Sequence, residues 1–554
     1  MHLRGRSALV LSLGIAASAW VACPCTAQPA GTPAARPACP VEGLRIGRIT
    51  IDRRPVFDTP PGDRSLSARV GGIANPLHVK TREHVIREEL LFREGDACRD
   101  EALAQSERNL RARELFQTVT ITTTRRDADV VDVHIAAQDA WTLRVSGDLA
   151  RIGGELVWEL GLADTNIAGE GFGIGVRHRE DIDASVSSAW AEHDRLFGTR
   201  ERLSLSIDDR SDGDAWAAGL SRPFFAIDSR WAHEVMAGRL RDHWRLYDAG
   251  EITDEFARDS TSVTARLARR VGPVRGDRAW RVGVGYRFSA VEFAPLGTAG
   301  VASDPEAVPP SHRYAGPFAT VQFLEHRFVK RRGLIVPDRD TDVNLGWQVN
   351  ASGWVSMRSA SLDTEPRTLV SASVSRGWTP GQSVVVTAAA GVTVRAGGPD
   401  PDNADATAAL RAWWPHSAVH TTALALDLRS LLNPERGYRL YLGGSAGLVG
   451  FREFSVYATR TATAQIEERR YFPWRPAGLV QFGVAAFAEA GALGGRTGDP
   501  LPRSFLADVG FGLRIAQLKS SANSAARVDI AFPLTTAAAG SRRPLLVVGY
   551  QRSF

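Results

Sequence analysis

After about residue 140, apolar and polar residues alternate along the chain with a period of two, which is the repeat of a β-strand. From Arg281 to Phe288 every second residue is a large apolar one, and the residues between them are arginine or glycine. The same alternation recurs in residues 203–208, 343–350 and 508–514. One face of such a strand suits lipid and the other suits water. This favours an all-β transmembrane β-barrel, although soluble β-sandwich domains can alternate in the same way.

A small domain with a different pattern precedes this region. Its predicted elements are a strand at residues 44–52, a Pro- and Gly-containing connection through Pro76, helices at 81–92 and 100–115, and strands at 118–124 and 130–136. The helices are indicated by apolar residues at helical spacing, and the strands by alternation. The Pro-, Ala- and Gly-rich residues 28–40 before it predict a disordered leader.

Tryptophan marks the boundary between the two regions. Residues 41–139 contain none, whereas thirteen of the 14 tryptophans lie at or after Trp141. Tryptophan is enriched at membrane interfaces, where its ring meets lipid and its N–H finds a polar partner. We therefore place a barrel in residues 141–554, with about 20 strands if each alternating segment is counted and fewer if some hairpins lie outside the membrane.

The N-terminus predicts export. Two arginines precede an apolar stretch at residues 8–22 and small residues follow, so residues 1–27 are interpreted as a signal peptide, with lipid modification at Cys23 as the alternative. The mature chain then retains Cys39 and Cys98, which could pair in an oxidising compartment or remain two free thiols. After this segment no run approaches the roughly 20 apolar residues of a spanning helix.

Charge gives no indication of a nucleic-acid partner. The formal net charge is +5, but the 67 basic residues are spread among 62 acidic ones without a basic tract. Dispersed charge on alternating strands fits a wet lumen and loops.

Several stretches resemble a known family. Residues 86–96 (Ile-Arg-Glu-Glu-Leu-Leu-Phe-Arg-Glu-Gly-Asp) and 106–111 resemble a POTRA domain, whose order of elements matches the one predicted above. Residues 442–451 (Leu-Gly-Gly-Ser-Ala-Gly-Leu-Val-Gly-Phe) resemble loop 6 of the Omp85 superfamily, and residues 467–474 and 485–491 resemble the two strands after that loop. The similarity covers nearly the whole mature chain.

The resemblance implies a fold, a location and a function. It implies one POTRA domain at residues 41–139 in the periplasm and a barrel of 16 antiparallel strands in the outer membrane of a Gram-negative bacterium. The implied function is insertion of outer-membrane proteins or translocation of polypeptides. The implied partners are the lipid bilayer, unfolded outer-membrane or secreted polypeptides that bind the POTRA domain, and the barrel-assembly machinery that inserts this chain. The alternative is a passive channel or structural barrel that uses the POTRA domain only for docking.

One position of the loop departs from the family. The motif residues here are Gly443, Gly444, Leu448, Val449, Gly450 and Phe451. In the family an arginine at the position of Val449 folds into the lumen and meets acidic residues of the next two strands. The acidic residues are retained, as Glu467 or Glu468 on one strand and Glu489 on the other. The resemblance therefore implies lumen carboxylates without their usual partner, and a loop that is held less firmly.

Another arginine could compensate for Val449. Arg452 lies three residues further on, and Arg436 takes the motif position if the register is shifted to residues 435–438. The glycine pair and the downstream spacing favour the register that ends at Val449.

The C-terminus resembles the signal by which assembly machinery recognises a barrel. Its residues are Gly549, Tyr550 and Phe554, although Arg552 occupies a position that is usually apolar. A last strand here could close the barrel against the first one and remove both sheet edges.

The sequence does not predict an enzyme, a cofactor or a metal site. No Gly-Lys pair of a phosphate-binding loop is present. His233-Glu234 begins a zinc-protease motif, but Ala237 stands where the second histidine is needed.

Overall fold

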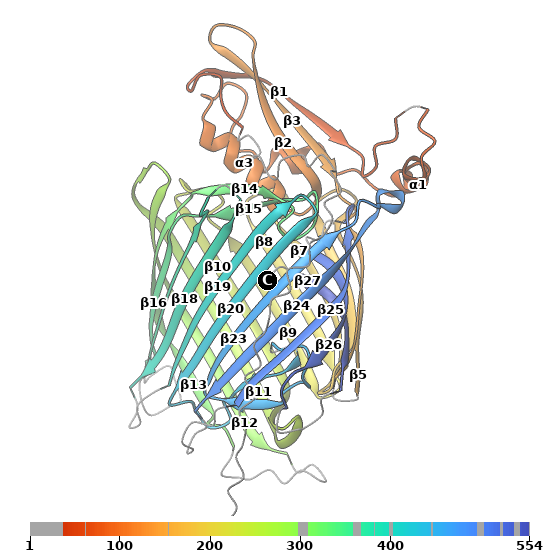
Figure 1. Cartoon of the computed structure of the whole chain (residues 1–554). Helices are drawn as coiled ribbons and strands as arrows, with labels where there is room; N and C mark the ends of the chain where they lie inside the picture. The colour runs from red at the N-terminus through yellow and green to blue at the C-terminus, as the bar shows by residue number, and fades with distance from the viewer. Residues whose placement is uncertain are drawn as a thin grey trace, which may run out of the picture.

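The computed structural model consists of a β-barrel with a small domain at one end (Figure 1). It describes residues 37–60, 62–152, 155–296, 308–357, 367–381, 383–397, 403–444, 447–495, 504–520, 524–536 and 543–552. The predicted signal peptide, most of the predicted leader and Phe554 lie outside the described residues.

The N-terminal domain packs helices against a three-stranded sheet. Its described elements are β1 Arg45–Arg54, α1 Leu66–Ala74, the 3-10 helix η1 Asn75–Leu77, α2 Glu83–Arg87, α3 Asp100–Ala112, β2 Phe116–Arg125 and β3 Val130–Asp139. The central strand β3 pairs in parallel with β1 and antiparallel with β2. All the predicted elements are present in the predicted order, and α1 is an addition.

Two helices differ from the prediction. α1 lies where the sequence predicts a connection, and the side chain of Ser65 caps its first turn. α2 ends at Arg87 and not at Phe92, because the N–H of Leu91 donates to Ser106 Oγ of α3 (2.9 Å) and does not continue the helix.

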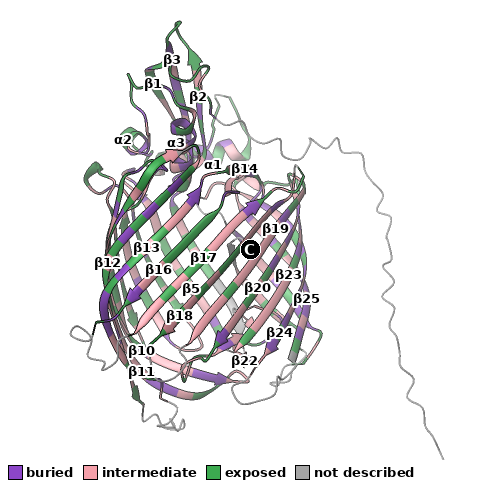
Figure 2. Ribbon diagram, turned by 90° about the vertical axis from the view of Figure 1, so that its left-hand side faces the viewer, coloured by how far each residue is buried: buried purple, intermediate pink, exposed green. Residues whose placement is uncertain are grey.

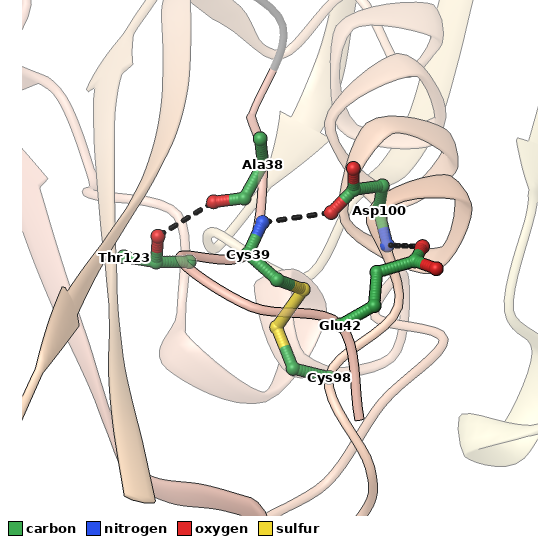
Figure 3. The surroundings of a disulfide bond; sticks show 6 residues. All are labelled: Ala38, Cys39, Glu42, Cys98, Asp100 and Thr123. Atoms are coloured by element: carbon green, nitrogen blue, oxygen red, sulfur yellow. Dashed lines mark hydrogen bonds between the residues drawn. A yellow bond between two sulfur atoms is a disulfide. The ribbon is translucent and has the colours of Figure 1, made fainter. Parts of the chain in front are cut away.

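A disulfide between Cys39 and Cys98 anchors the start of this domain (Figure 3). The Cys39 N–H also donates to Asp100 Oδ1 (2.7 Å), and the carbonyl oxygen of Ala38 accepts from Thr123 Oγ1 (2.6 Å). The pairing of the two cysteines is therefore confirmed. The prediction of a disordered leader is wrong for its last residues, because these contacts fix them to the domain.

Twenty strands form the barrel, and they close into a ring. In chain order they are β4 Leu143–Ile152, β5 Glu155–Ile167, β6 Phe172–Glu180, β7 Ser185–His193, β8 Arg202–Arg210, β9 Gly213–Arg222, β10 Trp231–Asp248, β11 Glu251–Arg275, β12 Arg278–Pro295, β13 His312–Glu325, β16 Gln348–Val355, β17 Thr368–Trp378, β18 Val385–Ala396, β19 Ala404–Ser417, β20 His420–Leu432, β23 Arg460–Tyr471, β24 Val480–Gly494, β25 Ser504–Gln517, β26 Ser524–Pro533 and β27 Leu545–Arg552. Neighbours pair antiparallel. The count from alternation is confirmed, and the 16 strands implied by the family resemblance are not what this chain forms.

The two faces of the strands differ in burial as the alternation predicts, and the burial class changes repeatedly along many of the strands (Figure 2). On β12, Val282 and Val284 are exposed on the outer surface, whereas Arg281 and Gly283 are buried on the lumen side. On β25, Phe511 is 57% exposed and Arg514 is fully buried. Among the described residues, no helix combines the length and the apolar character needed to cross a membrane.

The predicted strand at residues 343–350 is divided between two sheets. Its first residues belong to β15 Asp340–Asn344, which pairs with β14 Phe328–Arg332 in a separate hairpin, and the barrel strand β16 begins at Gln348. The Asn344 side chain accepts from the Gly346 N–H (2.9 Å) and turns the chain between them. Alternation alone does not show such a turn, because every second residue remains apolar before, within and after it.

Candidate functional site

The loop between β20 and β23, residues 433–459, folds back onto the inner wall of the barrel. It contains a short hairpin of β21 Leu440–Leu442 and β22 Val456–Ala458. Leu448 and Phe451 of the loop are buried together with Leu493 and Leu506, which lie on β24 and β25. This apolar cluster holds the loop against the wall.

The tip of the loop binds two carboxylates through its backbone. The Val449 N–H donates to Glu489 Oε2 (2.7 Å), and the Gly450 N–H donates to Asp508 Oδ2 (3.0 Å). Glu489 and Asp508 lie directly opposite one another on β24 and β25. A Cβ at Gly450 would lie 2.6 Å from the Cβ of Asp508, so only glycine allows this approach. Main-chain donors of Val449 and Gly450 thus meet two carboxyl groups of the barrel wall.

A tight turn positions this tip. Gly443 has φ +113°, and its N–H donates to the Gly447 carbonyl (3.0 Å). The N–H of Gly444 donates to the carbonyls of Leu448 (3.2 Å) and Phe451 (3.1 Å). The predicted motif glycines therefore have structural roles of their own and are more than ordinary loop residues.

Glu467 is the acidic residue of β23 that lies inside the barrel. It is fully buried, and Arg514 Nη2 of β25 donates to its Oε2 (2.9 Å). Arg469 also binds Glu467, and Arg514 continues to Asp529 of β26. These strand arginines were not predicted as site residues from the sequence, although the alternation places Arg514 on the lumen face.

The other candidate residues lie elsewhere. Side chains alternate along β23, so Glu468 points to the outer surface, where it binds His420 and Thr422. Arg436 and Arg452 have exposed side chains on the loop. The counter-charge that the structure describes for Glu467 comes from the strands, which corrects the expectation of a compensating loop arginine.

The same loop crosses the outer mouth of the barrel, at the end opposite the N-terminal domain. Trp244 Nε1 of β10 donates to the Gly437 carbonyl (3.2 Å), and the Tyr247 ring stacks on Phe454 at 4.3 Å between centroids. β23 is the ninth strand from β10 around the ring of twenty, so the loop reaches the opposite wall. The Tyr247 hydroxyl binds Asp183 in the turn after β6, and burial raises the pKa of that carboxyl to about 6.

A second segment lies at the inner mouth, below the N-terminal domain, and packs against one side of the barrel wall. The hairpin of β14 and β15 is joined by residues 333–339, whose Leu334 and Val336 are 2% and 1% exposed. These two side chains pack against inward residues of five strands, namely Val385, Trp413, Ala423, Tyr471 and Ala516. We call residues 326–345 the plug hairpin. The position of the plug hairpin against the barrel wall was not predicted, because the contacts that bury it come from strands more than 40 residues further along the chain.

The N-terminal domain is fixed to this end of the barrel by charged contacts. Glu89 is 1% exposed and binds Arg113 (3.0 Å) of its own domain together with Arg195 and Arg200 (3.5 Å) of the turn between β7 and β8. Burial, and then the neighbouring Arg195, lower the pKa of Arg200 to about 10.

The plug hairpin takes part in the same attachment. Lys330 Nζ donates to Glu107 of α3 (3.1 Å), and Arg111 of α3 donates to Asp342 (2.8 Å). The domain, the plug hairpin and the barrel rim are therefore in mutual contact.

The ring closes through a short seam. Among the described residues, β27 and β4 pair at two positions, Val547–Ala150 and Val548–Leu149, whereas β26 and β27 pair over eight residues and β4 and β5 over ten. Gly549 and Tyr550 of the predicted C-terminal signal lie in β27 and pair with β26, not with β4. The last strand is thus held almost entirely on one side.

Comparison with known proteins gives similar folds at low identity. No family model and no curated protein matches the chain. Among solved structures, BamA from Haemophilus ducreyi lacking POTRA domains 1–3 is 12% identical, with 91% of this chain and 84% of that chain covered and a TM-score of 0.35. CdiB from Escherichia coli is 12% identical, with 91% and 76% covered and a TM-score of 0.46. The FrpB iron transporter from Neisseria meningitidis is 8% identical, with 79% and 87% covered and a TM-score of 0.41.

Proposed function

We propose that this chain is an outer-membrane protein of the Omp85 type that inserts or translocates polypeptides, with residues 41–139 acting as a POTRA domain in the periplasm. The observation that carries the proposal is the seam, where β27 and β4 share two residue pairs. In lipid, backbone groups without partners are costly, so a strand edge there favours pairing with another strand. A polypeptide that adds to this edge would fold as it pairs, and folding itself would drive the reaction.

The two closures of the lumen favour this proposal over a passive channel. The plug hairpin occupies the inner mouth and residues 433–459 cross the outer one. A free diffusion path would require both to move, whereas the seam requires only β27 to part from β4.

One observation supports the passive channel as the second candidate. The lumen wall contains a cavity of about 520 Å³ with polar lining residues that include Gln322, Asn350, Ser371 and Thr393. Twenty strands also make a wider ring than the sixteen implied by the family. Such a wall would pass small polar solutes if both closures opened.

The N-terminal sheet offers one accessible edge to a client strand. β3 is central, and the outer side of β1 is partly covered because the N–H groups of Gly95 and Cys98 donate to the carbonyls of Ile46 and of Leu44, which precedes the strand. β2 is therefore the candidate edge. α3 already caps one of its amides, since Glu107 accepts from the Ile121 N–H (3.3 Å).

Photo-crosslinking tests this edge. A crosslinking residue at Thr120, which is exposed on β2, is expected to capture unfolded polypeptide in cells. The same probe at Asp127, in the exposed turn after β2, is the matched control and should capture much less. Equal capture at both positions, or none at Thr120, would contradict client binding at this edge.

A reversible lock tests the seam. Leu149 and Val548 are paired, so Leu149→Cys with Val548→Cys can form a disulfide across β4 and β27. Ile466→Cys with Ala488→Cys gives a control lock within the fully paired β23 and β24. We expect client insertion into liposomes to stop only in the seam-locked protein and to return on reduction. Full activity of the oxidised seam variant would rule out an opening seam.

A further inference from the structure

A group of metal-binding residue types lies on the outer surface of the barrel, away from the lumen and the seam. His416 on β19, His420 on β20 and Glu468 on β23 each offer one ligand atom, and these atoms lie within 4.8 Å of one another. The ring centroids of His416 and His420 are 4.6 Å apart. The sequence predicts no metal site here, because Glu468 lies 48 residues after the second histidine and only strand pairing brings them together.

The alternation of β20 shows which surface carries this group. Thr421 and Ala423 are buried on the lumen side, whereas Leu426 and Leu428 are exposed on the face that His420 shares. His420 is the first residue of β20, so the group lies at the barrel end that bears the N-terminal domain. Exposed aromatic residues surround this level of the barrel, namely Trp414, Phe472 and Trp474. Such rings typically lie at the lipid headgroup level, where water and ions reach side chains.

Hydrogen bonds already hold the group together. His416 Nε2 and Thr422 Oγ1 are 2.7 Å apart, Thr422 donates to Glu468 Oε2, and His420 Nε2 contacts Glu468 Oε1. Thr422 and Glu468 are paired directly across β20 and β23. Thr422 thus orients the carboxylate in the way that an outer-shell partner orients a metal ligand.

We propose that His416, His420 and Glu468 form a binding site for a divalent transition metal of the zinc class. Two imidazoles and one carboxylate suit zinc or copper, whereas magnesium and calcium require more oxygen ligands. Three protein ligands leave a fourth position for water. At metal–ligand distances of about 2.0–2.1 Å, the ligand atoms of a tetrahedral site lie about 3.3 Å apart. Exposed side chains can close the remaining gap by rotamer changes.

Bound metal would join the two strands between which the loop of residues 433–459 runs. β20 and β23 flank residues 433–459, and the site links their ends on the N-terminal-domain side. Arg470, exposed and paired opposite His420, places a positive charge beside the site and weakens it. The arrangement therefore predicts that Arg470→Gln binds metal more tightly than the native chain.

Metal content of the purified full chain tests the proposal. The protein, carrying an affinity tag without histidine, is dialysed in detergent against a chelator, then loaded with zinc and separated by gel filtration. Mass spectrometry of the element should find one zinc per native chain and none in the double variant His416→Ala with His420→Ala. Glu468→Gln should lower zinc affinity at least tenfold.

A matched variant controls for adventitious binding. His233 binds only one carboxylate among the described contacts, Glu201 (2.9 Å), so His233→Ala should keep the full zinc content. Heat-dependent mobility on gels verifies that each barrel is folded. The proposal is wrong if the native chain retains no zinc, or if the double variant and the native chain retain equal amounts.

Discussion

Substitution of Gly450 by alanine should release the loop of residues 433–459 from the barrel wall. The new Cβ would lie 2.6 Å from the Cβ of Asp508, so the main chain must withdraw and both tip hydrogen bonds are lost. Glu489 and Asp508 are buried directly opposite one another, and repulsion between two carboxylates favours one charged and one neutral acceptor. A hydrogen bond from an N–H group contributes about 1.5–3 kcal/mol to a charged acceptor and about 0.5–1.5 kcal/mol to a neutral one. Loss of the pair, about 2–4.5 kcal/mol, lowers the ratio of docked to undocked loop at least about 25-fold, since 1.4 kcal/mol corresponds to a factor of ten.

Hydrogen exchange measured by mass spectrometry reports this release directly. The peptide containing residues 447–451 should exchange much faster in Gly450→Ala than in the native protein, and conductance steps in planar bilayers should become larger because the loop also crosses the outer mouth. Gly353→Ala is the matched control, since a Cβ at Gly353 meets no atom within 4 Å. Unchanged exchange in residues 447–451 would refute the backbone-mediated docking.

Three further predictions concern the N-terminal end. Glu89→Gln should loosen the domain by about 3–5 kcal/mol, because it removes the charge of the buried carboxylate that Arg113, Arg195 and Arg200 share. Glu83→Gln should cost about 0.3–0.5 kcal/mol, because it breaks only an exposed pair with Arg87. Thermal unfolding measures both. Burial, and then nearby arginines, lower the pKa of His326 in the plug hairpin to about 4. The neutral imidazole therefore contributes its full stability above pH 6.5, and this contribution is lost as the pH falls toward 4. In His326→Gln the melting temperature should depend less on pH across this range. Cys98→Ser removes the disulfide to Cys39, which spans a sequence separation of 59. From the chain entropy of the opened loop, the free energy of unfolding of the domain in denaturant should fall by about 4 kcal/mol.

Local patterns predicted the parts of this structure that local physics determines. Alternation located the barrel strands because lipid and water impose opposite chemistry on their two faces. The glycine pair of the loop favoured the register that ends at Val449, and Gly443 adopts a backbone conformation that other residues avoid. The disulfide remained one of two alternatives, because pairing of Cys39 with Cys98 depends on how the domain brings them together.

Features that depend on distant contacts were not predicted. Leu334 and Val336 have no alternation or cap to distinguish them from an ordinary strand end, and their burial comes from five strands that the fold gathers around them. The ion pair of Arg514 with Glu467 joins residues 47 positions apart. Alternation placed Arg514 in the lumen, whereas Glu467 and Glu468 remained alternatives, and only the register of β23, β24 and β25 shows that Arg514 and Glu467 meet.

The three closures of this barrel differ in what would open them. The inner closure combines apolar burial of Leu334 with ion pairs to the N-terminal domain, so a client that displaces the domain also weakens the plug hairpin. The outer closure depends on backbone bonds to Glu489 and Asp508, which lie far from that domain. The seam has the fewest bonds, two residue pairs, and β27 remains attached to β26 when they break. On the proposed function, a client delivered by the N-terminal domain would therefore encounter the least resistance at the seam. Disruption of docking by Glu89→Gln should accordingly increase labelling of a cysteine placed at Val548 more than it increases conductance through the lumen.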